Sequence, residues 1–252
     1  MGAVIMLAAG GWARGAVGLM VAAVLAGLAV GNQPGQAEQT REAAKAAAAE
    51  QAGLVALELE LPKPAFRGTP RHVPPGSVNL EEPRKGPRPP LMVPPGTQNV
   101  ARDKPVTSSD KEPIIGALKF VTDGQKAAEE GTYVELGPGV QWVQIDLKEA
   151  YTLHGVLVWH YHLNARVYHD VLVQVADDAD FITNVRTLFN NDHDNSAGLG
   201  IGRDKEYWDT YEGKLIDARG EQARYVRLCS NGSTTDDQNH YVEVEVFARP
   251  AK

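Results

Sequence analysis

The stretch from Gln141 to Leu147 constrains the fold of this 252-residue chain more than any other. Apolar and polar side chains alternate along it, which is the pattern of a β-strand with one buried face. Four more strand-like runs follow it in the sequence, at residues 155–159, 171–176, 224–228 and 241–247. Polar loops separate these runs, and no strong 3.6-residue apolar period occurs near them. Because one strand cannot bury enough apolar surface by itself, the sequence predicts an all-β sandwich of the jelly-roll type over residues 99–250.

Residues 1–37 have the features of a secretory signal peptide. Arg14 precedes an uninterrupted apolar run at residues 15–31, and Gly35 and Ala37 place small side chains where a signal peptidase reads the chain. We therefore expect cleavage after Ala37 and a secreted or periplasmic protein of the bacterial cell envelope. The alternative is an uncleaved anchor, although the run is at the short end for a membrane span. The signal segment would then be the chain's only contact with a membrane.

Residues 38–98 connect this signal to the predicted sandwich. Alanine dominates their first part, which suits a short helix. From Pro62 to Gly96, proline is too frequent for a helix or for continuous strand pairing. The composition therefore predicts an extended tether. A strap that packs over the domain is the alternative, because residues 91–93 are apolar enough to dock.

Charge and cysteine content exclude several classes of function. The formal net charge is −7 and no basic cluster stands out, so we expect no nucleic-acid partner. Cys229 is the single cysteine, which excludes an internal disulfide and a multi-cysteine zinc site. The sequence has no Gly-x-Ser-x-Gly, no His-Glu-x-x-His and no P-loop motif. We therefore expect a protein that is not an enzyme.

Five short motifs occur in order between Asn99 and Phe247. They are Asn-Val-Ala-Arg-Asp-Lys-Pro-Val-Thr at 99–107, Val-Thr-Asp-Gly at 121–124, Trp-Val-Gln-Ile-Asp-Leu at 142–147, Ala-Arg-Tyr-Val-Arg-Leu at 223–228 and Glu-Val-Glu-Val-Phe at 243–247. In wording and order they resemble the coagulation factor 5/8 type C (discoidin) family. The resemblance implies a galactose-binding-like jelly roll. It says less about the ligand, because function lies in the loops of such a fold.

The same resemblance implies a structural calcium ion. Matched residue by residue, its ligands would be Asp123, Thr132 and Glu243 together with backbone carbonyls, which are the oxygen donors that calcium prefers. Two departures stand against it: Gln125 occupies a position where the family commonly has Asp or Asn, and residues 126–131 are inserted before Thr132. The alternative is that Asp123 begins an ordinary turn and Glu243 is a solvated strand residue.

Histidines offer a second type of metal site. His160 and His162 are two residues apart, so they would share one face of a strand. With a carboxylate from Asp170, Asp192 or Asp194 they would suit zinc or copper, and a metalloenzyme would require His160, His162 or His169 to converge with such a carboxylate. Buried histidines with hydrogen-bond partners are the ordinary alternative.

The loops carry the residue types of a sugar-binding site. A sugar has an apolar C–H face and a ring of hydroxyls, so its site pairs aromatic rings with Asn, Asp, His or Arg side chains. If the valines of 171–175 face the core, the period of two turns Arg166 and Tyr168 outward. Alternatively the aromatic rings belong to the core and the polar groups hold the loops together. The candidate ligand-binding residues are Tyr161, His162, Asn164, Arg166, Tyr168, Asp192, His193, Asn195, Asn239 and His240.

Taken together, the sequence predicts an exported, non-catalytic module that binds carbohydrate or a cell-surface polymer, with calcium stiffening its loops. One alternative is a structural or protein-interaction domain that contacts another envelope protein. The absence of a concave patch with an exposed aromatic ring would favour this alternative. Convergence of histidines with a carboxylate would favour the metalloenzyme.

Overall fold

The computed structural model describes residues 53–66 and 68–251. All of them fall in one unit of the chain, Glu42–Lys252. The predicted signal peptide and the alanine-rich segment lie outside the described residues, so both stay predictions. Over the described ranges, no helix has the length and apolar character needed to cross a membrane.

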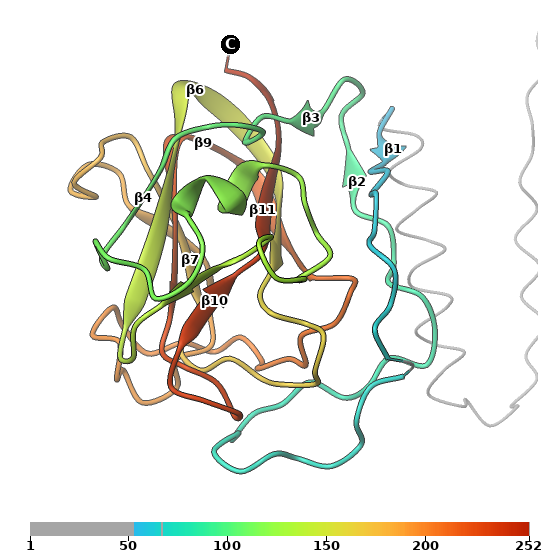
Figure 1. Ribbon diagram of the computed structural model, residues 1–252. Coiled ribbons are helices and arrows are strands. Elements are labelled where there is room, and N and C mark those ends of the chain that lie inside the picture. The colour runs from blue at the N-terminus through green and yellow to red at the C-terminus, as the bar shows by residue number, and fades with distance from the viewer. Residues whose placement is uncertain (1–52, 67, 252) are drawn as a thin grey trace, which may run out of the picture. The chain divides into compact units, whose positions relative to one another are not determined.

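Nearly all regular structure in the described part is β (Figure 1). The 3-10 helix η1 (Leu118–Thr122) is the one helical element there. The strands are β1 (Val55–Ala56), β2 (Met92–Val93), β3 (Gln98–Asn99), β4 (Val106–Ser108), β5 (Val134–Leu136), β6 (Gln141–Trp159), β7 (Leu172–Ala176), β8 (Arg186–Asn190), β9 (Lys214–Ser230), β10 (Asn239–Tyr241) and β11 (Glu243–Pro250). The all-β prediction is confirmed, although the predicted runs 141–147 and 155–159 form one continuous strand, β6, and the run 241–247 is divided between β10 and β11.

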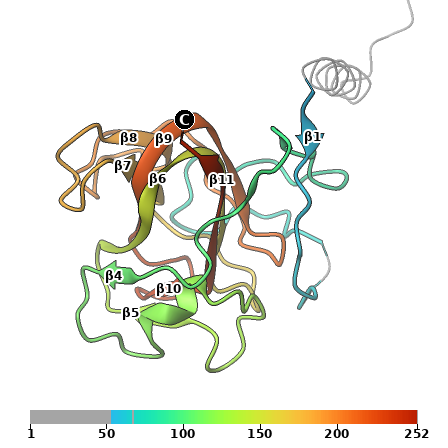
Figure 2. The same cartoon turned by 90° about the horizontal axis from the view of Figure 1, so that it is seen from above.

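Seven of these strands form one antiparallel sheet in the order β3-β11-β6-β9-β7-β8, with β4 beside β6. β6 and β9 pair along most of their length, and breaks in their register bend the pair near Lys148, which has a positive φ of 74°. β4 borders the first half of β6 and β11 borders the second half. A small sheet of β5 and β10 lies across the core from β7 and β9 (Figure 2). The two layers make the predicted sandwich.

Residues 141–147 form the first half of β6. Val143, Ile145 and Leu147 are fully buried in the main core, as their alternation predicts. Burying each such side chain contributes roughly 1.5–3 kcal/mol, so this strand is a major source of core stability. On the opposite face of the strand the Arg227 guanidinium stacks on Trp142, 4.6 Å from the ring centroid.

Residues 54–66 and 68–97 run along the outside of the sandwich as a strap (Figure 1). β1 pairs with β2, and the Leu57 N–H donates to the Leu91 carbonyl at 2.8 Å, so the strap folds back on itself. Leu57 and Leu59 pack on an outer apolar cluster. This cluster consists of Ala128, Leu157, Trp159, Val242 and Phe247.

Polar contacts fix the middle of the strap. The Glu206 carboxylate accepts the backbone N–H groups of Val78, at 2.8 Å, and Asn79, at 3.1 Å. Lys214 forms an ion pair with Glu81 at 2.8 Å. The described part of the predicted tether is therefore a packed strap, which the sequence left as an alternative. Proline removes backbone donors for strand pairing, but it does not prevent apolar and charged side chains from docking.

Candidate functional site

One end of the sandwich gathers polar and aromatic side chains from four separate segments. The loop after β6 contributes Tyr161 and Arg166, and the 231–238 loop contributes Asp236. β5 and β10 pair with Glu135 directly opposite His240. Because residues opposite each other in a sheet are neighbours, this pairing sets the geometry of the site.

Hydrogen bonds and ion pairs join these side chains. Arg166 Nη1 donates to Asp236 Oδ2 at 2.8 Å. His240 Nε2 lies 3.2 Å from Glu135 Oε2, and its Nδ1 lies 2.9 Å from the Tyr168 hydroxyl. Arg166 and His240 are buried, so the network fixes their orientation. The prediction that Arg166 faces outward is therefore wrong, because the residue lies in a loop where strand alternation does not apply.

Two tyrosines cover this network at the surface. Tyr133 and Tyr161 are half-buried and meet edge to face, with ring centroids 5.3 Å apart. Each ring also lies within 6 Å of the His240 ring, at 5.9 and 5.7 Å between centroids. The Arg166 guanidinium is 4.8 Å from the Tyr161 centroid. We call this set the tyrosine platform: Tyr133, Glu135, Tyr161, Arg166, Asp236 and His240.

Burial decides the protonation states beneath the platform. It raises the pKa of Tyr168 well above its ordinary value, so the hydroxyl keeps its proton and donates to His240 Nδ1. Burial also lowers the pKa of His240 to about 4, although the charge of Asp236 opposes the shift. At neutral pH the imidazole is therefore uncharged, and its Nε2 lies 3.2 Å from Glu135 Oε2.

The platform has an excess of negative charge. Burial raises the pKa of Glu135, and the nearby charge of Asp236 raises it further, while Arg166 acts in the opposite direction. With His240 neutral, two carboxylates face one guanidinium. A positively charged group on a ligand would relieve the repulsion between the carboxylates.

Some predicted ligand residues lie near the platform but point elsewhere. His162 is buried, burial lowers its pKa, and its Nε2 pairs with the Lys126 carbonyl at 2.8 Å. The Asn239 amide donates to the Gly137 and Gly139 carbonyls and so holds the turn between β5 and β6. Asn164 is exposed on the loop. None of the three joins the hydrogen-bond network described above.

Tyr168 is a correction to the sequence prediction. It was expected to face outward, but it is 1% exposed and stacks on His160, with centroids 4.4 Å apart. The period of two fails because β7 begins only at Leu172 and Asp170 before it has a positive φ of 51°. Tyr168 therefore orients His240 from inside the core.

The predicted residues of the 190–202 loop stabilise their own loop. Asp192 is fully buried and accepts the N–H groups of Ser196 and Ala197 at 3.1 and 3.0 Å. Asn195 accepts the Gly200 N–H at 2.6 Å. His193 is half-buried in the same loop. The three predicted residues are thus separate from the platform.

The structure does not assemble the predicted histidine metal site. In the described ranges, one group of three or more metal-ligating side chains has its ligand atoms within 4.8 Å of one another, and it consists of Asp170, Asp192 and Asp194. No histidine belongs to it. His160 lies 3.4 Å from Asp209 instead, because the chain leaves β6 at Trp159 and strand alternation ends there.

The implied calcium ligands are brought together in part. Glu243 is fully buried; its Oε2 accepts the Gly124 N–H at 2.8 Å, and its Oε1 has no hydrogen-bond partner among the described residues. Asp123 is close enough for its charge to raise the pKa of Glu243. An orphaned buried carboxylate oxygen beside a second carboxylate fits a calcium ion. The Thr132 hydroxyl donates to the Glu129 carbonyl in a surface turn, and no hydrogen bond among the described residues connects it to Asp123 or Glu243.

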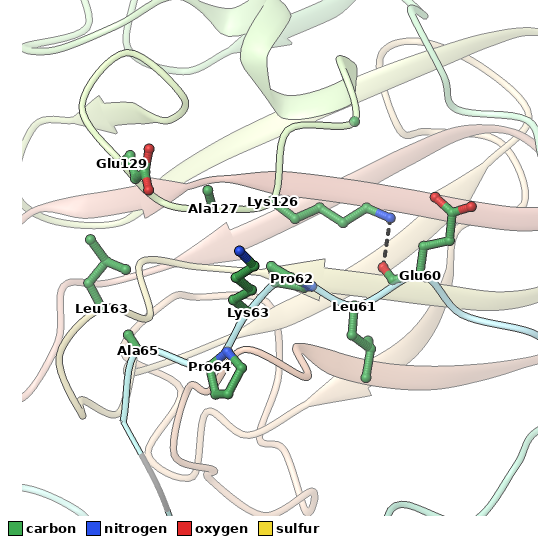
Figure 3. A pocket seen from close by; sticks show the side chains of 11 residues that line it. Glu60, Leu61, Pro62, Lys63, Pro64, Ala65, Lys126, Ala127, Glu129 and Leu163 are labelled. Atoms are coloured by element: carbon green, nitrogen blue, oxygen red, sulfur yellow. Dashed lines mark hydrogen bonds between the residues drawn. The ribbon is translucent and has the colours of Figure 1, made fainter.

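A groove lies beside the platform, between the strap and the body of the domain (Figure 3). Its volume is about 490 Å³. Strap residues 60–65 form one wall, and Leu163 and residues 124–129 contribute the rest. The Lys126 ammonium donates to the Glu60 carbonyl at 2.9 Å and pairs with Glu245 at 2.7 Å. We call this feature the strap groove.

Sequence reasoning missed three members of the platform, namely Tyr133, Glu135 and Asp236. A signal existed for the first two, since they alternate with the buried Val134 and Leu136 in a short period-two run. No local signal separates Asp236 from its polar neighbours.

No protein-family model matches the chain, and no curated protein matches it. Among solved structures it is similar to chitosan-binding module 1 of a chitosanase/glucanase from Paenibacillus sp. IK-5, at 21% identity and a TM-score of 0.43, over 59% of this chain and 98% of that chain. It is also similar to a fucose binding module of Streptococcus pneumoniae, at 20% identity and a TM-score of 0.44, over 62% and 98%. A family 89 glycoside hydrolase from Clostridium perfringens matches at 16% identity and a TM-score of 0.46, over 61% of this chain and 15% of the hydrolase.

Proposed function

We propose that this protein is an exported, non-catalytic carbohydrate-binding module whose ligand site is the tyrosine platform. The observation that carries the proposal is the fixed set of hydrogen-bonding side chains around two half-buried tyrosine rings, Tyr133 and Tyr161. The rings offer apolar surface to the C–H face of a sugar, and Glu135 and Asp236 offer partners to its hydroxyls, while the buried Arg166 holds Asp236 in place. Because these side chains are already held in place, binding costs little side-chain entropy.

The charge of the platform indicates which class of sugar it would prefer. Glu135 and Asp236 outnumber Arg166, so an acidic sugar would be repelled and an amino sugar attracted. A protonated amino group beside Tyr133 or Tyr161 would also gain from the negative face of the ring. We therefore infer a preference for sugars with free amino groups.

We also infer a relationship to the discoidin family. Three of the five motifs that resemble this family lie in β6, β9 and β11. These strands are neighbours in the large sheet, so segments far apart in the sequence contribute to one continuous surface. This arrangement supports the relationship beyond the order of the motifs in the chain.

We propose calcium as a structural ion at the loop of Asp123, held by Asp123, Glu243 and nearby backbone carbonyls. The orphaned Oε1 of Glu243 supports this assignment. The ion would connect the loop after η1 to β11 and so stiffen the side of the domain that carries the strap groove. The pH experiment in the Discussion tests it.

The experiment for the platform is a glycan array probed with the purified protein, in calcium and in EDTA, followed by titration calorimetry. We expect binding to glucosamine-containing glycans and a loss of affinity of up to about tenfold in Tyr161→Ala, because the stacked ring contributes about 0.5–1.5 kcal/mol. Tyr225→Ala is the matched control, since Tyr225 lies on β9 outside the platform. A blank array with folded protein would contradict the proposal and favour a protein-interaction domain.

A further inference from the structure

The strap groove and the tyrosine platform are adjacent parts of one surface. Leu163, which lines the groove, is two residues from Tyr161 in the same loop. Leu163, Tyr133 and Tyr161 pack against the same outer apolar cluster, which includes Ala128. Ala127 and Glu129, on either side of Ala128, line the groove. A ligand long enough to leave the platform along this loop would therefore enter the groove.

Contacts with the body of the domain hold the strap wall of the groove in place at the end where the wall begins, next to Leu59. Leu57 and Leu59 pack on the outer cluster just before the wall begins. At Glu60 the backbone carbonyl accepts a hydrogen bond from Lys126, whose side chain is itself fixed by a nearly buried ion pair with Glu245. Pro62 and Pro64 then restrict the backbone along the wall. The groove is thus preformed, as ligand sites usually are.

The chemistry of the groove suits one or two units of a polar chain. Its volume of about 490 Å³ lies within the roughly 300–1,000 Å³ of small-molecule sites. Leu61, Leu163 and the prolines supply apolar contacts. Lys63 and Glu129 are exposed at its rim, and Figure 3 shows the Lys63 side chain extending from the strap toward the 124–129 loop. Lys63 has no ion-pair partner among the residues described, so its ammonium is available to hydroxyl groups of a ligand.

We propose that the platform and the strap groove bind successive units of one glycan chain, so that the ligand is an oligosaccharide or polymer and the strap completes its site. This inference rests on the proposed carbohydrate-binding function. It assigns to the strap a role in recognition that the discoidin-like sandwich alone would not have.

The test measures affinity against chain length. The probes are β-1,4-linked glucosamine and β-1,4-linked N-acetylglucosamine oligomers, each from the monosaccharide to the hexamer, titrated calorimetrically into the full protein. We expect affinity to rise at least tenfold between the disaccharide and the hexamer, because the longer chain gains contacts in the groove. The two series also report whether free amino groups are preferred.

Two variants test whether the gain in affinity with chain length arises in the strap groove. Ala127→Trp fills the groove with a bulky side chain, and Lys63→Ala removes a donor at its rim. Both should lower hexamer affinity at least fivefold and leave the affinity for the disaccharide unchanged. Their controls are Ala179→Trp and Lys85→Ala, at exposed positions that do not line the groove. Thermal unfolding of every variant checks that the fold is kept.

Each outcome separates the inference from the function on which it rests. Affinity that does not depend on length, or a length gain that survives Ala127→Trp, would overturn the groove subsite and leave the platform in place. Loss of disaccharide and hexamer binding together in Tyr161→Ala supports the platform as the primary site. Failure of both series to bind would overturn the proposed preference and the inference together.

Discussion

At the scale of single residues, Glu243 couples protonation to folding. It is fully buried on β11, and burial raises its pKa to about 9, with the charges of Glu245 and Asp123 adding to the shift. In the unfolded chain the same group titrates near 4.5. The folded chain therefore holds an extra proton between these values. The stability from the neutral carboxyl is fully present below about 4.5 and is lost as the pH rises through about 9.

We therefore expect the free energy of unfolding in EDTA to fall with rising pH across this window, by up to about 1.4 kcal/mol per pH unit. Glu243→Gln should remove this slope. Calcium should flatten it in the unmodified protein, because the bound ion stabilises the carboxylate. Urea unfolding at several pH values, with exposed Glu58→Gln as control, provides the measurement. A slope that Glu243→Gln leaves intact would exclude this residue as its source, and stability indifferent to calcium would contradict the ion site.

His240 should make the free energy of unfolding depend on pH in the opposite direction. Burial lowers its pKa to about 4 from an ordinary value of 6.5, so the unfolded chain takes up a proton before the folded chain does. The stability that the neutral imidazole contributes is present above pH 6.5 and is lost as the pH falls through about 4. Relative to the unmodified protein, His240→Asn should lose less stability on acidification. The measurement is urea unfolding of both proteins across this window, with exposed His72→Asn as the comparison. Equal acid sensitivity in all three proteins would contradict the assignment.

At the scale of elements, the strap depends on side chains rather than on strand pairing. β1 and β2 each have two residues, so backbone pairing contributes little. The Glu206 carboxylate, by contrast, holds two strap N–H groups and lies 3.6 Å from His169 Nδ1. This residue connects the strap to the loop before β9.

Glu206→Ala should release the middle of the strap. We expect a destabilisation of roughly 1–3 kcal/mol, because two backbone donors lose their partner. Exposed Arg71 should then be cut by trypsin several times faster, since proteolysis follows local opening. Exposed Glu82→Ala on the same strap is the control. An unchanged cleavage rate in Glu206→Ala would mean that other contacts hold this segment.

At the scale of the whole molecule, the sequence predicts the sandwich and misses how its loops converge. Alternation in 141–147 places Val143 and Ile145 in the core because strand period and burial act locally. Glu135 meets His240 through the register between β5 and β10, which no local pattern specifies. The strap is a similar case. Its proline content predicts that long strands are absent, but it does not reveal where isolated apolar and charged side chains dock.

The position of the strap in the sequence also affects the order in which parts of the fold form. Its partners come late in the chain: Val78 and Asn79 bind Glu206, 128 and 127 residues further on. During synthesis the proline-rich segment therefore emerges long before the surface on which it rests. Long-range contacts of this kind form slowly, so the strap is expected to close last, after the sheet has formed. Until then the nascent protein presents a bare sandwich, and the groove acquires its second wall only in the finished molecule.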